Sequence, residues 1–208
     1  MTFSRADRDL LVRIGAALYD RGLTPGRTGN LSLASHGQVL ATPSGVSLGR
    51  LDPERLSVVS VDGTHLGGDP PTKELPLHLA LYRNHPTSRA VAHLHSTHAV
   101  AVSCLESLSE FDALPTITPY YAMRVGRLPV VDYAAPGSAH LLSLVESLAV
   151  TSRCLLMRNH GSIAAAADLE SAADAVEEIE ETSRLFLMLE GRRSRPLSDE
   201  QAAAIRSE

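Results

Sequence analysis

The chain has no tryptophan, few aromatic residues and only two cysteines. Aromatic residues make up 4% of its 208 residues, which argues against a carbohydrate or nucleic-acid surface built on aromatic stacking. Cys104 and Cys154 lie in apolar stretches and form no Cys-x-x-Cys motif. We therefore interpret both as small buried side chains, consistent with a reducing cytoplasm.

Long apolar runs and a surplus of positive charge are also missing. No apolar run approaches the roughly 18 residues of a transmembrane helix, and the charged N-terminal stretch has no apolar signal core. We therefore expect neither membrane insertion nor export. The formal net charge of −5 predicts no general attraction for nucleic acid or anionic membrane, so an anionic small molecule would need a local cationic or amide-rich site.

Apolar periodicity predicts helices and strands that alternate, with hairpins between some of the strands. We expect one domain over residues 1–208, a mixed sheet packed between helices, and a tail after about residue 191 that is loosely ordered or reaches a neighbouring subunit. In the last helix we interpret the glutamates as a solvated face: Glu177, Glu178, Glu180 and Glu181. The predicted helices are 4–22, 74–84, 96–105, 137–150 and 168–189, and the predicted strands are 31–34, 38–41, 57–61, 64–66, 89–95, 153–157 and 162–166.

Three histidines at the ends of apolar runs are the strongest chemical signal in the chain. His93 and His95 are two residues apart on a predicted strand, so their side chains project from the same face. His160 follows the apolar run 154–157 and could reach the same point from a neighbouring strand. Three imidazoles leave one coordination position open, which is typical of a catalytic zinc site. The alternative is that these histidines bond to the backbone at strand ends.

Glu74 and three loops rich in small polar residues precede this strand. The loops are Thr28-Gly29-Asn30, Thr42-Pro43-Ser44-Gly45 and Pro71-Thr72-Lys73-Glu74, and together they could hold a phosphate, especially where Thr72-Lys73 opens a helix. Each loop taken singly is no more than a turn. Glu74 lies in the first turn of a helix, where the helix dipole alone favours a carboxylate. Beside a metal-polarised carbonyl it could also transfer a proton.

In order and spacing, these motifs resemble those of the class II aldolase/adducin family. The resemblance rests on Thr28-Gly29-Asn30-Leu31-Ser32, Thr42-Pro43-Ser44-Gly45, Lys73-Glu74, His93-Leu94-His95 and Asn159-His160-Gly161, and it extends from about residue 8 to 190. It implies an α/β class fold, a three-layer α/β/α sandwich with a mixed, largely antiparallel central sheet. It also implies a homotetramer whose active sites lie at subunit interfaces.

The resemblance further implies roles for individual residues. One zinc ion per subunit would be held by His93, His95 and His160, with Glu74 as an additional ligand without substrate and as the acid/base, and with manganese or cobalt as alternatives to zinc. The residues implied to hold the substrate phosphate are Asn30, Ser44, Gly45, Thr72 and Lys73.

Two segments resemble one branch of the family, the 3-oxo-tetronate 4-phosphate decarboxylases. They are 93–105 and 118–129, and Thr72-Lys73-Glu74 stands where sugar aldolases carry Ser-Ser-Glu. The resemblance implies a carbon–carbon lyase that releases carbon dioxide and dihydroxyacetone phosphate through a metal-stabilised enediolate. Arg124 is a candidate partner of the substrate carboxylate.

Other members of the fold family remain alternatives. An aldolase would need a further proton donor, for which Tyr120 and Tyr121 are candidates. A pentulose-phosphate 4-epimerase and a non-catalytic adducin-like interaction domain are also compatible with the fold. The intact histidines and Glu74 disfavour the interaction domain.

Overall fold

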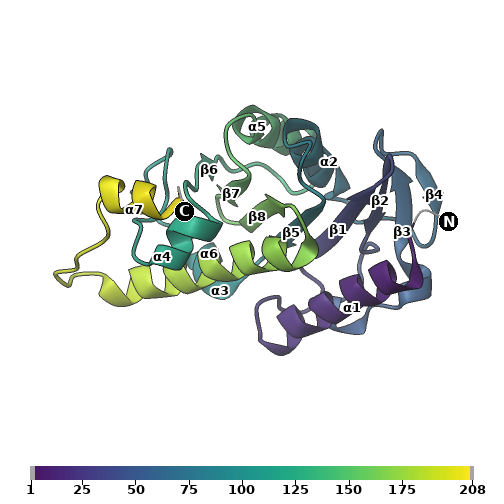
Figure 1. The fold of residues 1–208 in the computed structure, drawn as a ribbon, viewed down its shortest axis with the longest axis horizontal. Coiled ribbons are helices and arrows are strands. Elements are labelled where there is room, and N and C mark those ends of the chain that lie inside the picture. Colours follow the sequence, from purple (N-terminus) through teal and green to yellow (C-terminus); the bar gives the residue numbers. More distant parts are fainter. Residues whose placement is uncertain (1–2, 207–208) are drawn as a thin grey trace.

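The computed structural model describes residues 3–206, and its centre is one eight-stranded sheet (Figure 1). The strand order is β4-β3-β2-β1-β5-β8-β7-β6, and all neighbours are antiparallel except β6 and β7. The predicted mixed, largely antiparallel sheet is therefore confirmed. The strands are β1 (Asn30–Ser35), β2 (Gln38–Ala41), β3 (Ser57–Ser60), β4 (His65–Gly67), β5 (Ala90–Leu94), β6 (Val130–Val131), β7 (Cys154–Met157) and β8 (Gly161–Ala166).

Helices cover both faces of this sheet, which confirms the three-layer sandwich. Figure 1 shows α2 and α5 on one side, and α1, α3 and α6 on the other. None of the helices among the described residues is both long and apolar enough to cross a bilayer. The helices are α1 (Arg5–Asp20), α2 (Leu75–Asn84), α3 (Thr97–Ser103), α4 (Pro119–Arg124), α5 (Ala139–Ala149), α6 (Leu169–Leu189) and α7 (Asp199–Arg206), with short 3₁₀ turns at Leu48–Arg50 and Pro53–Arg55.

The three central strands β5, β8 and β7 are buried along their whole length. Side chains on one face join the core beneath α1, α3 and α6, and those on the other face pack against α2 and α5. A strand that is covered on both faces has a continuous apolar sequence rather than an alternating one. Such a strand gives a firm position to polar residues at its end, and the histidine motifs lie at these ends.

Side-chain caps set the starts of α1 and α6 near the predicted positions. Ser4 and Asp7 form a capping box, in which each side chain accepts a hydrogen bond from the backbone N–H of the other. Asp168 caps α6 by accepting from the backbone N–H of Ser171 at 2.7 Å. These caps satisfy backbone donors that the first helical turn leaves without partners.

Two burial predictions were wrong. Cys104 is exposed, because α3 ends at Ser103 and leaves the thiol beyond the packed face, whereas Cys154 is buried in β7 as expected. Glu180 is buried with 8% of its surface exposed, because α3 packs against this part of α6. The other glutamates of the predicted solvated face are half-buried or exposed.

Glu180 caps α3 from outside that helix. Its carboxylate accepts hydrogen bonds from the backbone N–H groups of His98 at 3.0 Å and Ala99 at 2.7 Å, and its Oε1 lies 2.7 Å from His98 Nδ1. Ser96, the residue that precedes α3, donates its hydroxyl to the carbonyl of Leu23 instead of capping the helix. A carboxylate from α6 therefore provides the cap that the local sequence does not.

The structure also differs from the prediction in its short elements and in the tail. Helix α4 and the two-residue strand β6 were not predicted, since neither is long enough to show a periodic pattern. The segment expected to be loose contains α7, which packs against α4. The backbone N–H of Leu197 donates to the carbonyl of Thr116 at 2.9 Å, and Ala202 is buried.

Candidate metal centre and the adjoining pocket

Four side chains from three parts of the chain converge at one end of β5. Glu74 is the N-cap residue of α2, His93 lies in β5, His95 follows that strand, and His160 precedes β8. Their four ligand atoms all lie within 4.8 Å of one another. The Nε2 atoms of His93 and His95 are 3.0 Å apart, and Glu74 Oε1 lies 2.9 Å from His160 Nε2. The structure thus brings together the four residues that the sequence suggested as metal ligands.

Two atoms of this cluster are buried without a hydrogen-bond partner among the described residues, Glu74 Oε1 and His160 Nε2. Leaving a buried polar atom without a partner costs about 1–3 kcal/mol, so such atoms call for an explanation. Three imidazole nitrogens and one carboxylate oxygen are a donor set that suits a divalent transition-metal ion. The arrangement could hold such an ion, which would satisfy both atoms.

A backbone carbonyl fixes the proton position on His93. His93 Nδ1 lies 2.8 Å from the carbonyl oxygen of Ser162 in β8. A carbonyl oxygen only accepts, so Nδ1 carries the hydrogen and Nε2 presents its lone pair to the cluster. A second hydrogen bond of this kind commonly orients a histidine that binds a metal.

The cluster shifts the pKa values of its members toward the forms that bind a cation. Burial, together with the nearby His93 and His160, lowers the pKa of His95 to about 3. Burial acts to raise the pKa of Glu74, but the nearby imidazoles of His93 and His160 outweigh it and hold that pKa well below its usual range. His95 is therefore neutral and Glu74 ionised near neutral pH.

The backbone around His160 explains the Asn-His-Gly motif. Asn159 has φ 55°, in the left-handed region that asparagine tolerates better than most residues. A Cβ atom on Gly161, which has φ 154°, would lie 2.2 Å from the carbonyl oxygen of Leu94. Any side chain at Gly161 would therefore push β8 away from β5 and separate His160 from His93 and His95.

A pocket of about 260 Å³ opens beside Glu74 and His95. Neither Lys73 nor Arg27 forms an ion pair with any residue in 3–206, so both cations are available to an anionic ligand. All five residues predicted to hold phosphate line the pocket: Asn30, Ser44, Gly45, Thr72 and Lys73.

Sequence reasoning missed four residues of this pocket: Arg27, Val46, Pro136 and Gly137. Arg27 directly precedes the Thr28-Gly29-Asn30 loop, so its position in the motif was a usable signal. Pro136 and Gly137 come from a distant loop, and nothing in their local sequence indicates that they approach Lys73.

Three further predicted site residues lie elsewhere in the chain. Tyr121 is fully buried in the core, and burial together with nearby Asp112 raises the pKa of its hydroxyl. Tyr120 is exposed and lines a separate pocket with Arg124. Arg124 is paired with Asp174 of α6. Within one subunit, the structure does not bring these side chains to the four-residue cluster.

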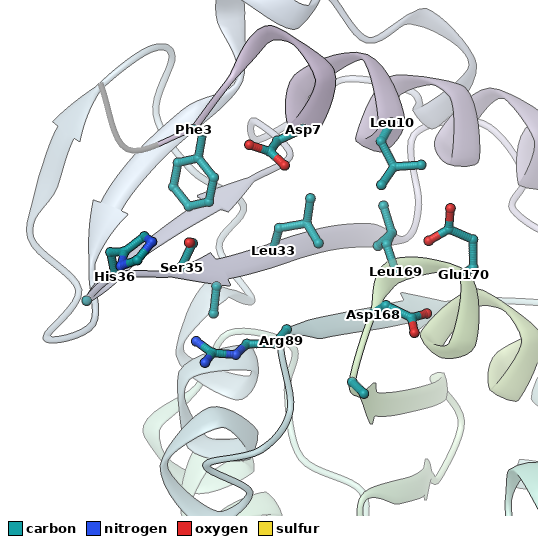
Figure 2. A pocket seen from close by; sticks show the side chains of 13 residues that line it. Phe3, Asp7, Leu10, Leu33, Ser35, His36, Arg89, Asp168, Leu169 and Glu170 are labelled. Carbon is teal, nitrogen blue, oxygen red and sulfur yellow. The ribbon is translucent and has the colours of Figure 1, made fainter.

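A second pocket, of about 470 Å³, lies at the opposite end of β5 (Figure 2). Leu10 of α1, Leu33 of β1 and Leu169 of α6 face one another in it, and Arg89 lies just before β5. The pocket contains none of the predicted site residues, and its charged side chains have both signs. The predicted metal and phosphate residues therefore lie at the His95 end of the strand and not in this pocket.

Comparison with known proteins agrees with this geometry. Residues 9–187 match the family described as Class II Aldolase and Adducin N-terminal domain. The 3-oxo-tetronate 4-phosphate decarboxylase of Haemophilus influenzae is 46% identical over 195 residues, which are 93% of this chain and 93% of that protein.

Two solved structures also superimpose on nearly the whole chain. YgbL from Klebsiella pneumoniae superimposes with a TM-score of 0.94 at 39% identity, covering 98% of this chain and 100% of the other. An L-fuculose 1-phosphate aldolase superimposes with a TM-score of 0.90 at 26% identity, covering 99% and 97% of the two chains.

Proposed function

The chain belongs to the class II aldolase and adducin family, and we propose that it is a metal-dependent carboxy-lyase that converts a 3-oxo-tetronate 4-phosphate to dihydroxyacetone phosphate and carbon dioxide. The observation that carries the proposal is its 46% identity, over 93% of both chains, to a decarboxylase of that name. The L-fuculose 1-phosphate aldolase structure superimposes on this chain with a TM-score of 0.90, but its sequence is only 26% identical. The chemistry of the pocket supports the same choice.

The proposed substrate carries two anionic groups, a phosphate and a carboxylate. The pocket offers two unpaired cations, Arg27 and Lys73, and the small polar loops at Asn30 and Ser44. Arginine pairs with planar or tetrahedral oxyanions in a bidentate way, and lysine acts as a point charge. A ketose phosphate, which has no carboxylate, would use only part of this charge, so Arg27 and Lys73 favour the sugar-acid phosphate.

Decarboxylation breaks the C1–C2 bond and leaves an electron pair that the C3 carbonyl oxygen has to accept. A divalent cation held by His93, His95 and His160, with Glu74 as a further ligand only without substrate, would supply Lewis-acid polarisation of that carbonyl. Glu74 lies next to this position and would deliver a proton to C2. It is ionised in the cluster, so it must first take up a proton from solvent, and Oε1 is the oxygen free to carry it.

We further propose zinc as the metal and a homotetramer as the working assembly. Three histidines and a carboxylate suit zinc, although manganese or cobalt would also fit this donor set. The exposed Tyr120 lies on α4, away from its own cluster, and in an assembly with interface active sites it would be available to a neighbouring subunit. Two free cysteines support a reducing, cytoplasmic setting for this step of carbohydrate metabolism.

The direct test is to incubate zinc-loaded protein with 3-oxo-tetronate 4-phosphate and to measure carbon dioxide and dihydroxyacetone phosphate together. We expect the two products in equal amounts, and we expect both to disappear with a chelator and return with zinc. Zinc-loaded protein that releases no carbon dioxide would contradict the proposal.

Aldol cleavage is the second candidate, because of the structural match to the fuculose phosphate aldolase. Cleavage of L-fuculose 1-phosphate by the same zinc-loaded sample, followed as aldehyde release, separates the two reactions. We expect at least tenfold lower kcat/KM than for the acid phosphate, since the neutral sugar leaves one cation of the pocket unpaired.

A further inference from the structure

The side chain of Asn30 connects Glu74 to a buried histidine of α2. Asn30 lies at the start of β1 opposite His93, and its Nδ2 donates to Glu74 Oε2 at 2.9 Å. On its other side, Asn30 Oδ1 lies 2.5 Å from Nε2 of His78. Asn30 is 4% exposed and His78 is fully buried, so the connection is closed to solvent. Glu74 thus has a buried polar neighbour that is separate from the three histidines.

The chemistry of the groups fixes the direction of these hydrogen bonds. An ionised carboxylate only accepts, so the Asn30 amide must face Glu74 and its carbonyl oxygen must face His78. His78 Nε2 therefore carries the hydrogen. Burial, together with the nearby His93, lowers the pKa of His78 to about 3, so the ring has only one proton near neutral pH.

The other side of the imidazole is also occupied. With its proton on Nε2, His78 accepts at Nδ1 from the hydroxyl of Ser32, 2.8 Å away, and Ser32 Oγ in turn lies 2.7 Å from the hydroxyl of Tyr82. These partners hold the ring in one tautomer. A histidine that served only to fill space would need none of them, since an apolar side chain fills a buried position without the cost of burying polar groups.

We propose that His78 is a positioning residue for Glu74 and that it acts through Asn30. The two ends of an asparagine amide are almost equal in shape, so packing alone does not choose between its two orientations. The Glu74 carboxylate favours one orientation, and the N–H of His78 on the other side holds the amide in it. In the other orientation the Asn30 oxygen would face the Glu74 carboxylate, which would repel it and lose the hydrogen bond to Oε2.

As a consequence, the two carboxylate oxygens of Glu74 have different surroundings. Oε2 is held by Asn30, and Oε1 stays directed toward His160 without a hydrogen-bond partner among the described residues. This inference rests on the proposed function insofar as Oε1 is the atom that transfers the proton. The orientation of Glu74 itself can be tested without any substrate.

The experiment compares His78→Gln with His78→Met. Glutamine can donate an N–H to Asn30, whereas methionine has a similar length and no donor. Co²⁺ alone is the probe, because its visible absorption spectrum reports the ligands and geometry of its site. We expect the methionine variant to change the spectrum and to lose about 10–100-fold in Co²⁺ affinity, and the glutamine variant to stay within about threefold of the native protein.

A double-mutant cycle then tests whether His78 acts through Asn30. In the Asn30→Ala background, His78→Met should change Co²⁺ affinity no further. In the enzyme assay, His78→Met should lower kcat about 10–100-fold with little change in KM, and His78→Gln should restore most of kcat. Thermal unfolding of each variant identifies any that is misfolded. If a His78 variant is misfolded, Asn30→Ser tests the connection between His78 and Glu74 by changing Asn30 instead.

Equal losses for His78→Gln and His78→Met would overturn the proposal, since packing would then explain both. Additive effects of the Asn30 and His78 substitutions would overturn it as well. If the native protein turned over none of the substrates, the proposed function would fail while the Co²⁺ measurements still decided the role of His78.

Discussion

Glu74 is half-buried and Glu180 is buried, and each carboxylate lies beside a histidine, but their hydrogen bonds differ. Glu180 accepts three hydrogen bonds, two from the backbone of α3 and one from the ring of His98. Glu74 accepts one at Oε2 from Asn30, while its Oε1 is buried with no such partner among residues 3–206. One carboxylate is satisfied by the fold, and the other is not.

This difference separates a structural group from a group poised for chemistry. A buried charge whose hydrogen bonds are complete fixes the elements that it joins, here α6 and α3. A buried charge with an incomplete set is costly to the fold, so its presence points to a ligand. Burial or a neighbouring histidine alone would not distinguish the two glutamates.

The largest effect is expected from the histidines beside the two carboxylates. His93→Ala removes a ligand atom and the hydrogen bond to Ser162, so we expect bound metal and activity to be lost. His98→Ala removes only one bond to Glu180, so metal stoichiometry should remain that of the native protein. Elemental analysis of both purified variants makes the comparison, and full metal content in the His93 variant would refute the site.

The next largest effect concerns Glu74 itself. Glu74→Gln keeps the three imidazoles but removes the ionisable oxygen, so we expect metal to remain while kcat falls about 10²–10⁴-fold. Steady-state kinetics alongside metal analysis measure both quantities. A rate near that of the native enzyme would exclude Glu74 from proton transfer.

The corresponding change at Glu180 should lower the stability of the fold and leave the enzymatic activity unchanged. Glu180→Gln replaces an acceptor of three hydrogen bonds by a group with one acceptor atom, so we expect the free energy of unfolding to fall by about 1–3 kcal/mol. Glu181→Gln is the matched control. Its side chain is exposed and pairs only with Arg184, so its change should stay within about 0.5 kcal/mol. Urea unfolding measures the free energy of unfolding of both variants. Equal changes in the two would contradict a structural role for Glu180.

The last effect is a pH dependence of stability that comes from the histidines on the Glu74 side. Burial lowers the pKa values of His78 and His95 from 6.5 to about 3, so the unfolded chain binds protons that the folded chain does not. Stability in chelator is therefore complete above about pH 6.5 and falls toward pH 3, by up to about 1.4 kcal/mol per pH unit for each histidine. Urea titrations across this range should show a shallower fall for His78→Gln, and an unchanged slope would contradict the assignment.

The sequence predicted what depends on local pattern. Continuous apolar runs located the central strands, the capping residues Ser4 and Asp168 located α1 and α6, and the order of the polar motifs identified the family. His93, His95, His160 and Glu74 were suggested together because a strand end and a helix start restrict where a side chain can point.

Features that depend on packing between distant elements could not be predicted from the local sequence. The burial of Glu180 depends on α3 lying across α6, and the four glutamates look alike in sequence. Tyr121 and Arg124 were candidates for the site, but Tyr121 is buried in the core and Arg124 pairs with Asp174. The position of His78 beside Asn30 and Ser32 could not be predicted either, since both partners come from a strand far away in the chain.

The separation of the four ligand residues along the chain has a consequence for folding. Glu74 precedes α2, His93 and His95 end β5, and His160 enters β8, so the ligand atoms meet only after β5 and β8 have paired. Pairing of strands so far apart in sequence is slow, because a long loop must close before any contact compensates for the lost entropy. Metal uptake during refolding should therefore trail the formation of secondary structure and mark the moment when the chain reaches its native topology.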